Sequence, residues 1–270
     1  MSFWRRFPQR AYIAVFLLLI YAPILLVIIY SFNKSRLSSR WGGFSLTWYR
    51  ELFRDRATFE ALRNSLILAI SSSLAAAVIG ALGAVGLSRA GVPGARAMGY
   101  LAVLPIMIPE IIMGMVFLAF FALLGLPFGM LTLSIGHTAF CVPYPFLLVK
   151  ARLTGLDPSY VEAARDLGAG EWRAFFDITF PQILPAVVSG ILISFAMSFD
   201  DVIVSVFVTG PAINTLPIKI YSQIKTGVTP KINALCTLLF VLTVVLGIVS
   251  GYLALGGGKK IKIQAKGEST

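Results

Sequence analysis

The stretch that decides the fold extends from Leu156 to Pro181 and reads LDPSYVEAARDLGAGEWRAFFDITFP. It separates two long apolar stretches of the chain and is itself too charged to cross a bilayer. Its first half has apolar residues at positions i, i+3, i+4 and i+7, the spacing of one helical face: Tyr160, Ala163, Ala164 and Leu167. Charged residues fall on the opposite face: Glu162, Arg165 and Asp166. The pattern predicts a short amphipathic helix that does not span the membrane.

Signals for both ends of this helix are present. Asp157 suits the N-cap position, Pro158 suits the first helical position, and Gly168 suits the end of a helix. A second short helix is predicted by aromatic residues at i, i+3 and i+4: Trp172, Phe175 and Phe176. The two helices form an elbow ahead of the next apolar stretch. Periodicity alone leaves open whether this elbow is a passive surface element or a docking element.

The composition outside the elbow is that of a membrane protein. Hydrophobic residues make up 57% of the chain and charged residues 13%, which leaves too little polar surface to cover a soluble core. Long intervals almost without charge predict about six spanning helices in one all-α, polytopic membrane domain over residues 1–270. The predicted spans are 11–31, 66–87, 98–124, 130–149, 181–208 and 232–255.

Small residues mark a helix-packing face in the second predicted span. Ser71–Ala77 is followed by Gly80, Gly83 and Gly86, and such residues let helices approach closely in lipid. The partner of this face is either another helix of the same chain or a second membrane subunit. In the first loop, Trp48 and its aromatic and apolar neighbours predict a short helix, which serves either as an interfacial anchor or as a contact for a receptor.

The net charge of +11 does not indicate nucleic-acid binding, because the basic residues are spread over tails and loops without a compact patch. Arg5, Arg6 and Arg10 precede the first span and predict a cytoplasmic N-terminus. The chain has no phosphate-binding loop and a single histidine, His137, so no catalytic residues, metal site or cofactor of its own are expected.

Carboxylates inside apolar stretches are the candidate transport residues. Glu110 lies in the third predicted span, and Asp200 and Asp201 lie in the fifth. A charge at the bilayer centre costs roughly 2.5 to 3.5 kcal/mol, so such residues face a pathway or a partner. One of the two aspartates has a structural alternative, an ion pair with Lys219 or Lys225. Carboxylates on a pathway predict a cationic substrate.

Two aromatic residues near these carboxylates, Phe199 and Tyr221, are candidates for cation–π contact with an amine that sheds water. They complete the predicted substrate pathway.

The elbow also carries a family resemblance. The run 162–168, EAARDLG, followed by 178–181, ITFP, resembles the EAA signature of binding-protein-dependent ABC importer permeases, with Phe180 where the family usually has Leu. The resemblance implies the type I permease fold and, for loop 150–180, the role of coupling helices that sit in a groove of a cytosolic ATPase. The residues that inherit this coupling role by resemblance are Glu162, Ala163, Ala164, Asp166 and Gly168.

A second resemblance covers nearly the whole chain. Residues 199–205, 207–211 and 216–222 resemble the second permease subunit of spermidine/putrescine importers. This implies polyamine uptake across a bacterial inner membrane with a second permease, an ATPase dimer that binds ATP and Mg²⁺, and a periplasmic polyamine-binding protein. Two alternatives remain: a permease of the same type for iron, thiamine or an opine, and an ion-coupled secondary transporter that uses the same carboxylates.

Overall fold

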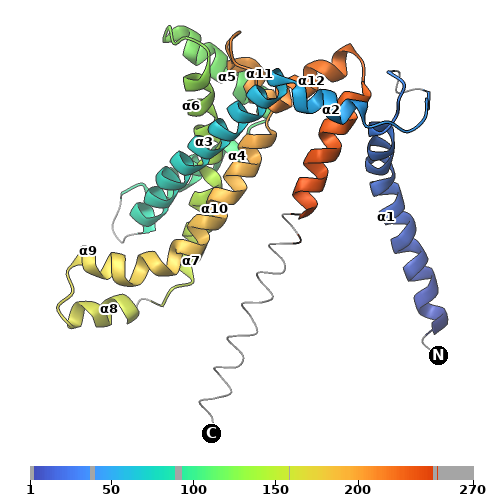
Figure 1. The fold of residues 1–270 in the computed structure, drawn as a ribbon. Helices are drawn as coiled ribbons and strands as arrows, with labels where there is room; N and C mark the ends of the chain where they lie inside the picture. Colours follow the sequence, from blue (N-terminus) through green and yellow to red (C-terminus); the bar gives the residue numbers. More distant parts are fainter. Residues whose placement is uncertain (1–2, 37–39, 89–92, 158, 246–247, 249–270) are drawn as a thin grey trace. The chain divides into compact units, whose positions relative to one another are not determined.

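The computed structural model describes residues 3–36, 40–88, 93–157, 159–245 and 248, and these residues are almost entirely helical (Figure 1). Contacts between residues divide the chain into two compact units, one made of Met1–Arg56 with Ser222–Thr270 and the other of Ala57–Tyr221. The single domain over residues 1–270 therefore stays a prediction.

The first unit contains the N-terminal and C-terminal helices. Its elements are α1 (Phe3–Ser31), α2 (Thr47–Arg54) and a helix at Pro230–Val245. The predicted short helix in the first loop is α2, and its residues Trp48 and Leu52 are buried. Trp48 Nε1 donates to the Asn33 carbonyl at 2.6 Å, and the hydroxyl groups of Tyr49 and Ser31 are 2.6 Å apart. Hydrogen bonds from the aromatic residues of α2 thus hold the first loop against the end of α1.

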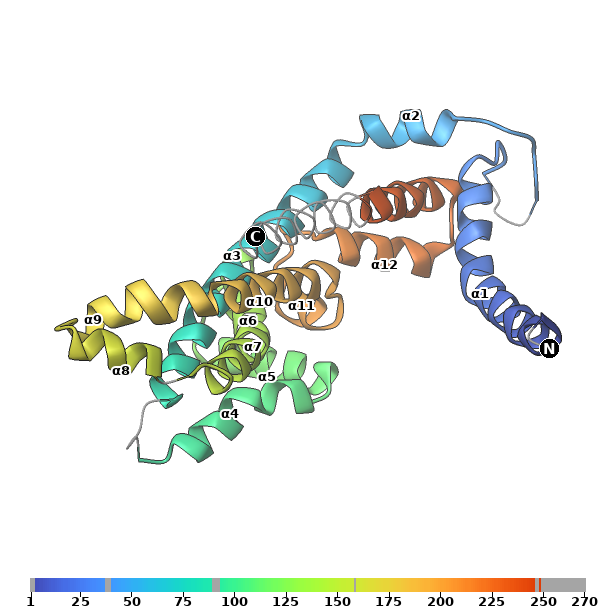
Figure 2. The same cartoon turned by 90° about the horizontal axis from the view of Figure 1, so that it is seen from below.

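The second unit contains the central helices and the elbow. Its elements are α3 (Arg56–Ser88), α4 (Ala95–Met107), α5 (Glu110–Leu123), α6 (Met130–Cys141), α7 (Pro143–Thr154), α8 (Ser159–Asp166), α9 (Glu171–Ala174), η1 (Phe175–Thr179), α10 (Phe180–Asp200) and α11 (Ile203–Val208). The boundary between the two units falls after Tyr221, inside α12 (Leu216–Thr226). Figures 1 and 2 both show α10 alongside α7, and the elbow of α8 and α9 at the end of α10 that is remote from α11.

Four described helices are long and apolar enough to span a membrane: Tyr12–Ser31, Arg56–Ser88, Met130–Thr154 and Glu171–Asp200. The pair α4 and α5 makes a fifth if it is one broken span, and Pro230–Val245 is a shorter apolar helix at the edge of the described residues. The predicted spans 98–124 and 181–208 were wrong as continuous helices, because the chain breaks at Ile108–Pro109 and after Asp200. The end of the predicted span 232–255 lies largely outside the described residues.

The core of the second unit consists of two apolar clusters. Leu68, Phe121, Leu133, Val204 and Val208 form one, and Ala84, Phe146, Val149 and Ile183 form the other. The small residues of α3 pack inside the chain, since Ser72, Ser73, Ala76, Ala77 and Gly80 are buried. At these positions the packing partner is therefore another helix of the same chain, one of the two predicted alternatives.

Candidate functional site

The break between α4 and α5 is set by proline. Pro109 has no N–H group and disfavours the helical conformation in the residue before it. Ile108 is accordingly extended, with φ −84° and ψ 129°. The two helices meet at an angle of 107°, and Glu110 becomes the first residue of α5 instead of a residue inside a span. The predicted continuous helix is thus replaced by a corner that presents a carboxylate.

The break between α10 and α11 contains the second carboxylate. Asp201 is extended, with ψ 129°, and its side chain accepts hydrogen bonds from the backbone N–H groups of Val204 at 3.2 Å and Ser205 at 2.7 Å. It therefore caps the start of α11 and satisfies backbone donors that would otherwise lack partners. The sequence allowed one aspartate to be structural. The structural role of Asp201 is a different one from the predicted ion pair with Lys219 or Lys225, because its observed hydrogen bonds are to backbone N–H groups.

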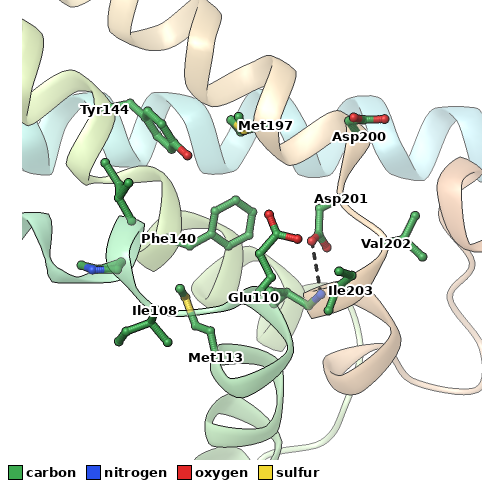
Figure 3. A pocket seen from close by; sticks show the side chains of 13 residues that line it. Ile108, Glu110, Met113, Phe140, Tyr144, Met197, Asp200, Asp201, Val202 and Ile203 are labelled. Atoms are coloured by element: carbon green, nitrogen blue, oxygen red, sulfur yellow. Dashed lines mark hydrogen bonds between the residues drawn. The ribbon is translucent and has the colours of Figure 1, made fainter.

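Both breaks lie on one cavity of about 500 Å³ (Figure 3). Glu110, Asp200 and Asp201 line it together, so the structure brings all three predicted carboxylates to one place. Figure 3 shows the side chains of Glu110 and Asp201 pointing toward one another. Because irregular backbone is tolerated at membrane depth only where it is buried in protein or lines a cavity, the two breaks and the cavity are physically linked.

The aromatic residues that line the cavity differ from the predicted ones. Phe140 and Tyr144 contribute to the lining, whereas Phe199 and Tyr221 do not. Phe199 stacks on Phe195 with ring centroids 5.8 Å apart. Tyr144 carried a signal that the sequence reasoning missed, since it is a polar aromatic residue in an apolar run.

A buried chain of polar side chains adjoins the cavity. His137 is fully buried, and its Nδ1 lies 2.8 Å from Ser198 Oγ while its Nε2 lies 3.0 Å from Ser205 Oγ. The same Nε2 is 3.5 Å from Asp201 Oδ2. Ser198 Oγ continues the chain to Ser72 Oγ at 2.9 Å. Side chains from α3, α6, α10 and α11 are therefore connected beside the carboxylates.

The elbow at the other end of α10 has the predicted turn. Gly168 has φ +85°, a conformation that residues with a Cβ rarely adopt, and it ends α8 as predicted. Arg165 of α8 donates to Glu171 of α9 at 2.8 Å. Asp157 Oδ1 accepts from the Ser159 N–H at 2.9 Å, and this hydrogen bonding lowers the pKa of Asp157. The predicted helical position of Pro158 lies outside the described residues.

The second half of the elbow differs from the predicted separate short helix. The aromatic segment is the beginning of a continuous helical stretch, Glu171–Asp200, which passes through the π-helical turn η1. Trp172 and Phe176 stack there at 6.3 Å. A π turn inside a helix is frequently found at functional sites. The elbow is thus joined to the cavity by uninterrupted helix over about 44 Å at 1.5 Å per residue.

The apolar face of α8 is exposed. Leu167 is 89% exposed and Tyr160 59%, and Trp172 at the start of α9 is 76% exposed. Val161 and Arg165 instead line a second cavity, together with residues at the ends of α3 and α7. The predicted apolar face of α8 therefore points away from the other helices of the second unit and is available to a partner.

Broken spans around a carboxylate-lined cavity, with an exposed elbow at one end, make up a fold that solved ABC importers share, the type I permease fold. A bacterial ABC transporter involved in the import of the acidic polysaccharide alginate has this fold, with a TM-score of 0.73 at 15% identity over 93% of this chain and 98% of that chain. The MetNI methionine ABC transporter is also similar, with a TM-score of 0.61 at 20% identity over 79% of this chain and 99% of that chain.

The chain belongs to the family of binding-protein-dependent transport system inner membrane components, which matches residues 76–256. The putrescine transport system permease protein PotI of Escherichia coli (strain K12) is 41% identical over 87% of this chain and 86% of its own length. The spermidine/putrescine transport system permease protein PotC of Haemophilus influenzae (strain Rd KW20) is 39% identical over 91% and 96%. The predicted family resemblance is confirmed.

Proposed function

We propose that this chain is a permease subunit of an ATP-driven importer that carries polyamines across the bacterial inner membrane. The relatives that resemble it over most of their length are putrescine and spermidine/putrescine permeases. The observation that carries the proposal is the meeting of Glu110, Asp200 and Asp201 at one cavity beside two helix breaks. A cluster of carboxylates within a membrane domain favours a cationic partner, and a polyamine supplies several ammonium groups.

The cavity lining suits the chemistry of a polyamine. Each ammonium group donates hydrogen bonds and carries a positive charge. The carboxylates of Glu110 and Asp200 can accept these hydrogen bonds and attract the charge. The methylene segments between the ammonium groups are apolar and match Met113, Met197 and Phe140. The ring of Tyr144 adds cation–π attraction for an ammonium group that has lost part of its water. Asp201 is committed to the cap of α11 and contributes charge more than direct contact.

The elbow is the proposed coupling element. Glu162, Ala163 and Gly168 are exposed, Ala164 is half-buried and Asp166 is exposed, so this surface is open to an ATPase subunit. The ATPase subunit would hold ATP and Mg²⁺, and this chain would hold neither. Because α9, η1 and α10 form one helical stretch, a displacement of the elbow moves the end of α10 at the cavity.

The topology agrees with a cytosolic elbow. Four candidate spans precede it when α4 and α5 are taken as one broken span. An even number of crossings returns the chain to the side of its N-terminus. The three arginines before the first span favour a cytoplasmic N-terminus, so the elbow would face the cytosol.

In the proposed cycle, a periplasmic binding protein delivers the polyamine to this chain and a second permease. Closure of the ATPase dimer on ATP pushes the elbow and, through α10, changes the spacing of the two breaks that line the cavity. The ammonium groups exchange water for carboxylates during passage, and hydrolysis resets the elbow. This chain supplies the path and the coupling, and the chemical step takes place on the partner.

The test is uptake of labelled putrescine and spermidine by vesicles that contain the reconstituted complex. We expect uptake that depends on ATP inside the vesicles and is lost when this subunit is left out. Uptake driven by an ion gradient without ATP would favour the secondary-transporter alternative. Binding of iron, thiamine or an opine but no polyamine by the purified receptor would assign a different substrate to the same type of permease.

A further inference from the structure

His137 bridges the break between α10 and α11 from within the core. Ser198, which it contacts through Nδ1, precedes the break, and Ser205, which it contacts through Nε2, follows the break. The backbone between Asp200 and Ile203 lacks helical structure, so regular helix hydrogen bonds do not hold the two segments together. One rigid imidazole ring therefore joins the two segments that flank Asp200 and Asp201.

The serine hydroxyl groups determine the direction of the hydrogen bonds. Ser72 Oγ donates its single hydrogen to the Leu68 carbonyl at 2.6 Å, so Ser72 accepts from Ser198. Ser198 has then used its hydrogen and accepts from Nδ1–H of His137. Nε2 completes the bridge through its 3.0 Å contact with Ser205 Oγ. Both ring nitrogens of His137 have a serine partner, which makes the ring a well-defined spacer.

The ring also contacts the lining of the cavity from behind. Its centroid is 5.0 Å from that of Phe140, which lines the cavity, while His137 itself does not. Asp201 Oδ2, 3.5 Å from Nε2, is held by the Ser205 N–H, so His137 and Asp201 both fix the position of Ser205. The imidazole thus acts on the cavity through its neighbours.

We propose that His137 is a positioning residue for transport: by joining Ser198 to Ser205 it holds the end of α10 and the start of α11 at the spacing that places Asp200 and Asp201 on the cavity wall. This inference rests on the proposed function for its consequence, because the positioned carboxylates are those that would receive the polyamine. Its structural part, the spacing across the break, stands independently of the substrate.

The spacing across the break is measured by pulsed electron resonance on the full complex. Spin labels are placed at two exposed positions, Leu184 in α10 and Val206 in α11, after both cysteines are replaced by alanine. His137→Leu replaces the imidazole by an apolar side chain of similar size and removes both hydrogen bonds. His137→Gln keeps a donor and an acceptor on one amide. Thr138→Val is the matched control, because Thr138 donates only within α6, to the Ser134 carbonyl.

We expect His137→Leu to broaden or shift the distance distribution, His137→Gln to restore much of the wild-type distribution, and Thr138→Val to match the wild type. Unchanged distances in His137→Leu would overturn the proposal. So would equal changes in the leucine and glutamine variants, since packing alone would then explain them. These expected distances do not depend on whether polyamines are the substrate of the complex.

Transport provides the functional test in the same preparations. His137→Leu is expected to lower the number of polyamine molecules moved per ATP hydrolysed by about three- to tenfold, the effect of losing about one net hydrogen bond, with the receptor-stimulated ATPase rate retained. His137→Gln should recover part of the ratio. If His137→Leu moved as many polyamine molecules per ATP as the wild type, His137 would have no role in transport. A wild-type complex without ATP-dependent polyamine uptake would instead refute the proposed function, while the distance measurement would still decide the positioning role.

Discussion

Gly190 of α10 lies against Pro145 of α7 so closely that a Cβ added to Gly190 would meet Pro145 Cα at 2.7 Å. Gly80 of α3 approaches the same turn, and a Cβ there would lie 2.8 Å from the Val142 carbonyl oxygen. Helices in lipid lack a hydrophobic force that drives them together, so close backbone contact at small residues is a main source of their association. The start of α7 is therefore the place where α3, α7 and α10 are joined.

Gly190→Ala is expected to destabilise the protein, because the new methyl group would contact the backbone of Pro145. Inserting a methyl group into a packed contact costs about 1 to 3 kcal/mol. The measurement is the unfolding midpoint of the purified chain in detergent. Gly86→Ala in α3 is the control, since nothing lies within 4 Å of a Cβ at that position. If the two variants unfold at the same midpoint, the contact between Gly190 and Pro145 is not important for stability.

The adjacent aspartates are expected to respond differently to loss of charge. Asp201→Ala removes the cap of α11 and should lower the free energy of unfolding by about 0.5 to 2 kcal/mol. Asp200 is exposed at the cavity, so Asp200→Asn should leave the unfolding midpoint unchanged and reduce polyamine uptake several-fold. Unfolding and uptake are measured on the same preparations. Wild-type uptake in Asp200→Asn would remove this carboxylate from the substrate pathway.

The two glycines of the elbow provide a matched test of coupling. Gly168 has φ +85°, whereas Gly170 has φ −66°, a conformation open to any residue. Gly168→Ala should strain the turn by about 1 kcal/mol and displace α8 from α9. We expect more ATP hydrolysed per molecule transported in Gly168→Ala and a wild-type ratio in Gly170→Ala. Equal ratios in both variants would contradict a role for the glycine turn in coupling.

The start of α8 should depend on pH through Asp157. Hydrogen bonds from Ser159 lower the pKa of Asp157 in the folded chain below its ordinary value of 3.8. The stabilisation is therefore present above that ordinary value and is lost as the pH falls through the lowered pKa. Amide exchange of the α8 segment, corrected for intrinsic rates, should rise on acidification in the wild type. Asp157→Asn keeps an acceptor oxygen without a titrating group, so the same rise in that variant would assign it to another residue.

Several features could be predicted because each depends on residues close together in the chain. The amphipathic spacing from Tyr160 to Leu167 and the glycine at 168 predicted α8 and its end, and both are observed. Long charge-poor intervals predicted the spans at 11–31, 66–87 and 130–149, since a bilayer acts on each stretch of about 20 residues separately. The EAA resemblance likewise rests on one local run, and it predicted the family correctly.

The breaks were harder to predict because their consequences depend on distant partners. Pro109 was visible in the sequence, but the corner at Ile108 requires that α5 find another packing surface, which it does on α11. The continuation of the elbow into α10 through η1 was also missed, because a proline such as Pro181 normally marks the start of a helix, whereas here it lies inside the helical stretch, just after the π-helical turn. Phe140 and Tyr144 were missed because no spacing in the chain relates them to Glu110.

The sequence by itself determined the class of this protein: an all-α membrane permease with an amphipathic elbow, whose local patterns of charge and hydrophobicity are imposed by lipid and water. Only the tertiary structure decided that Glu110 and Asp201, far apart in the chain, face one cavity, and that His137 ties the two sides of the second break. The physical reason is that these relations come from packing between helices, and close packing is a property of the surfaces that meet and not of either segment alone.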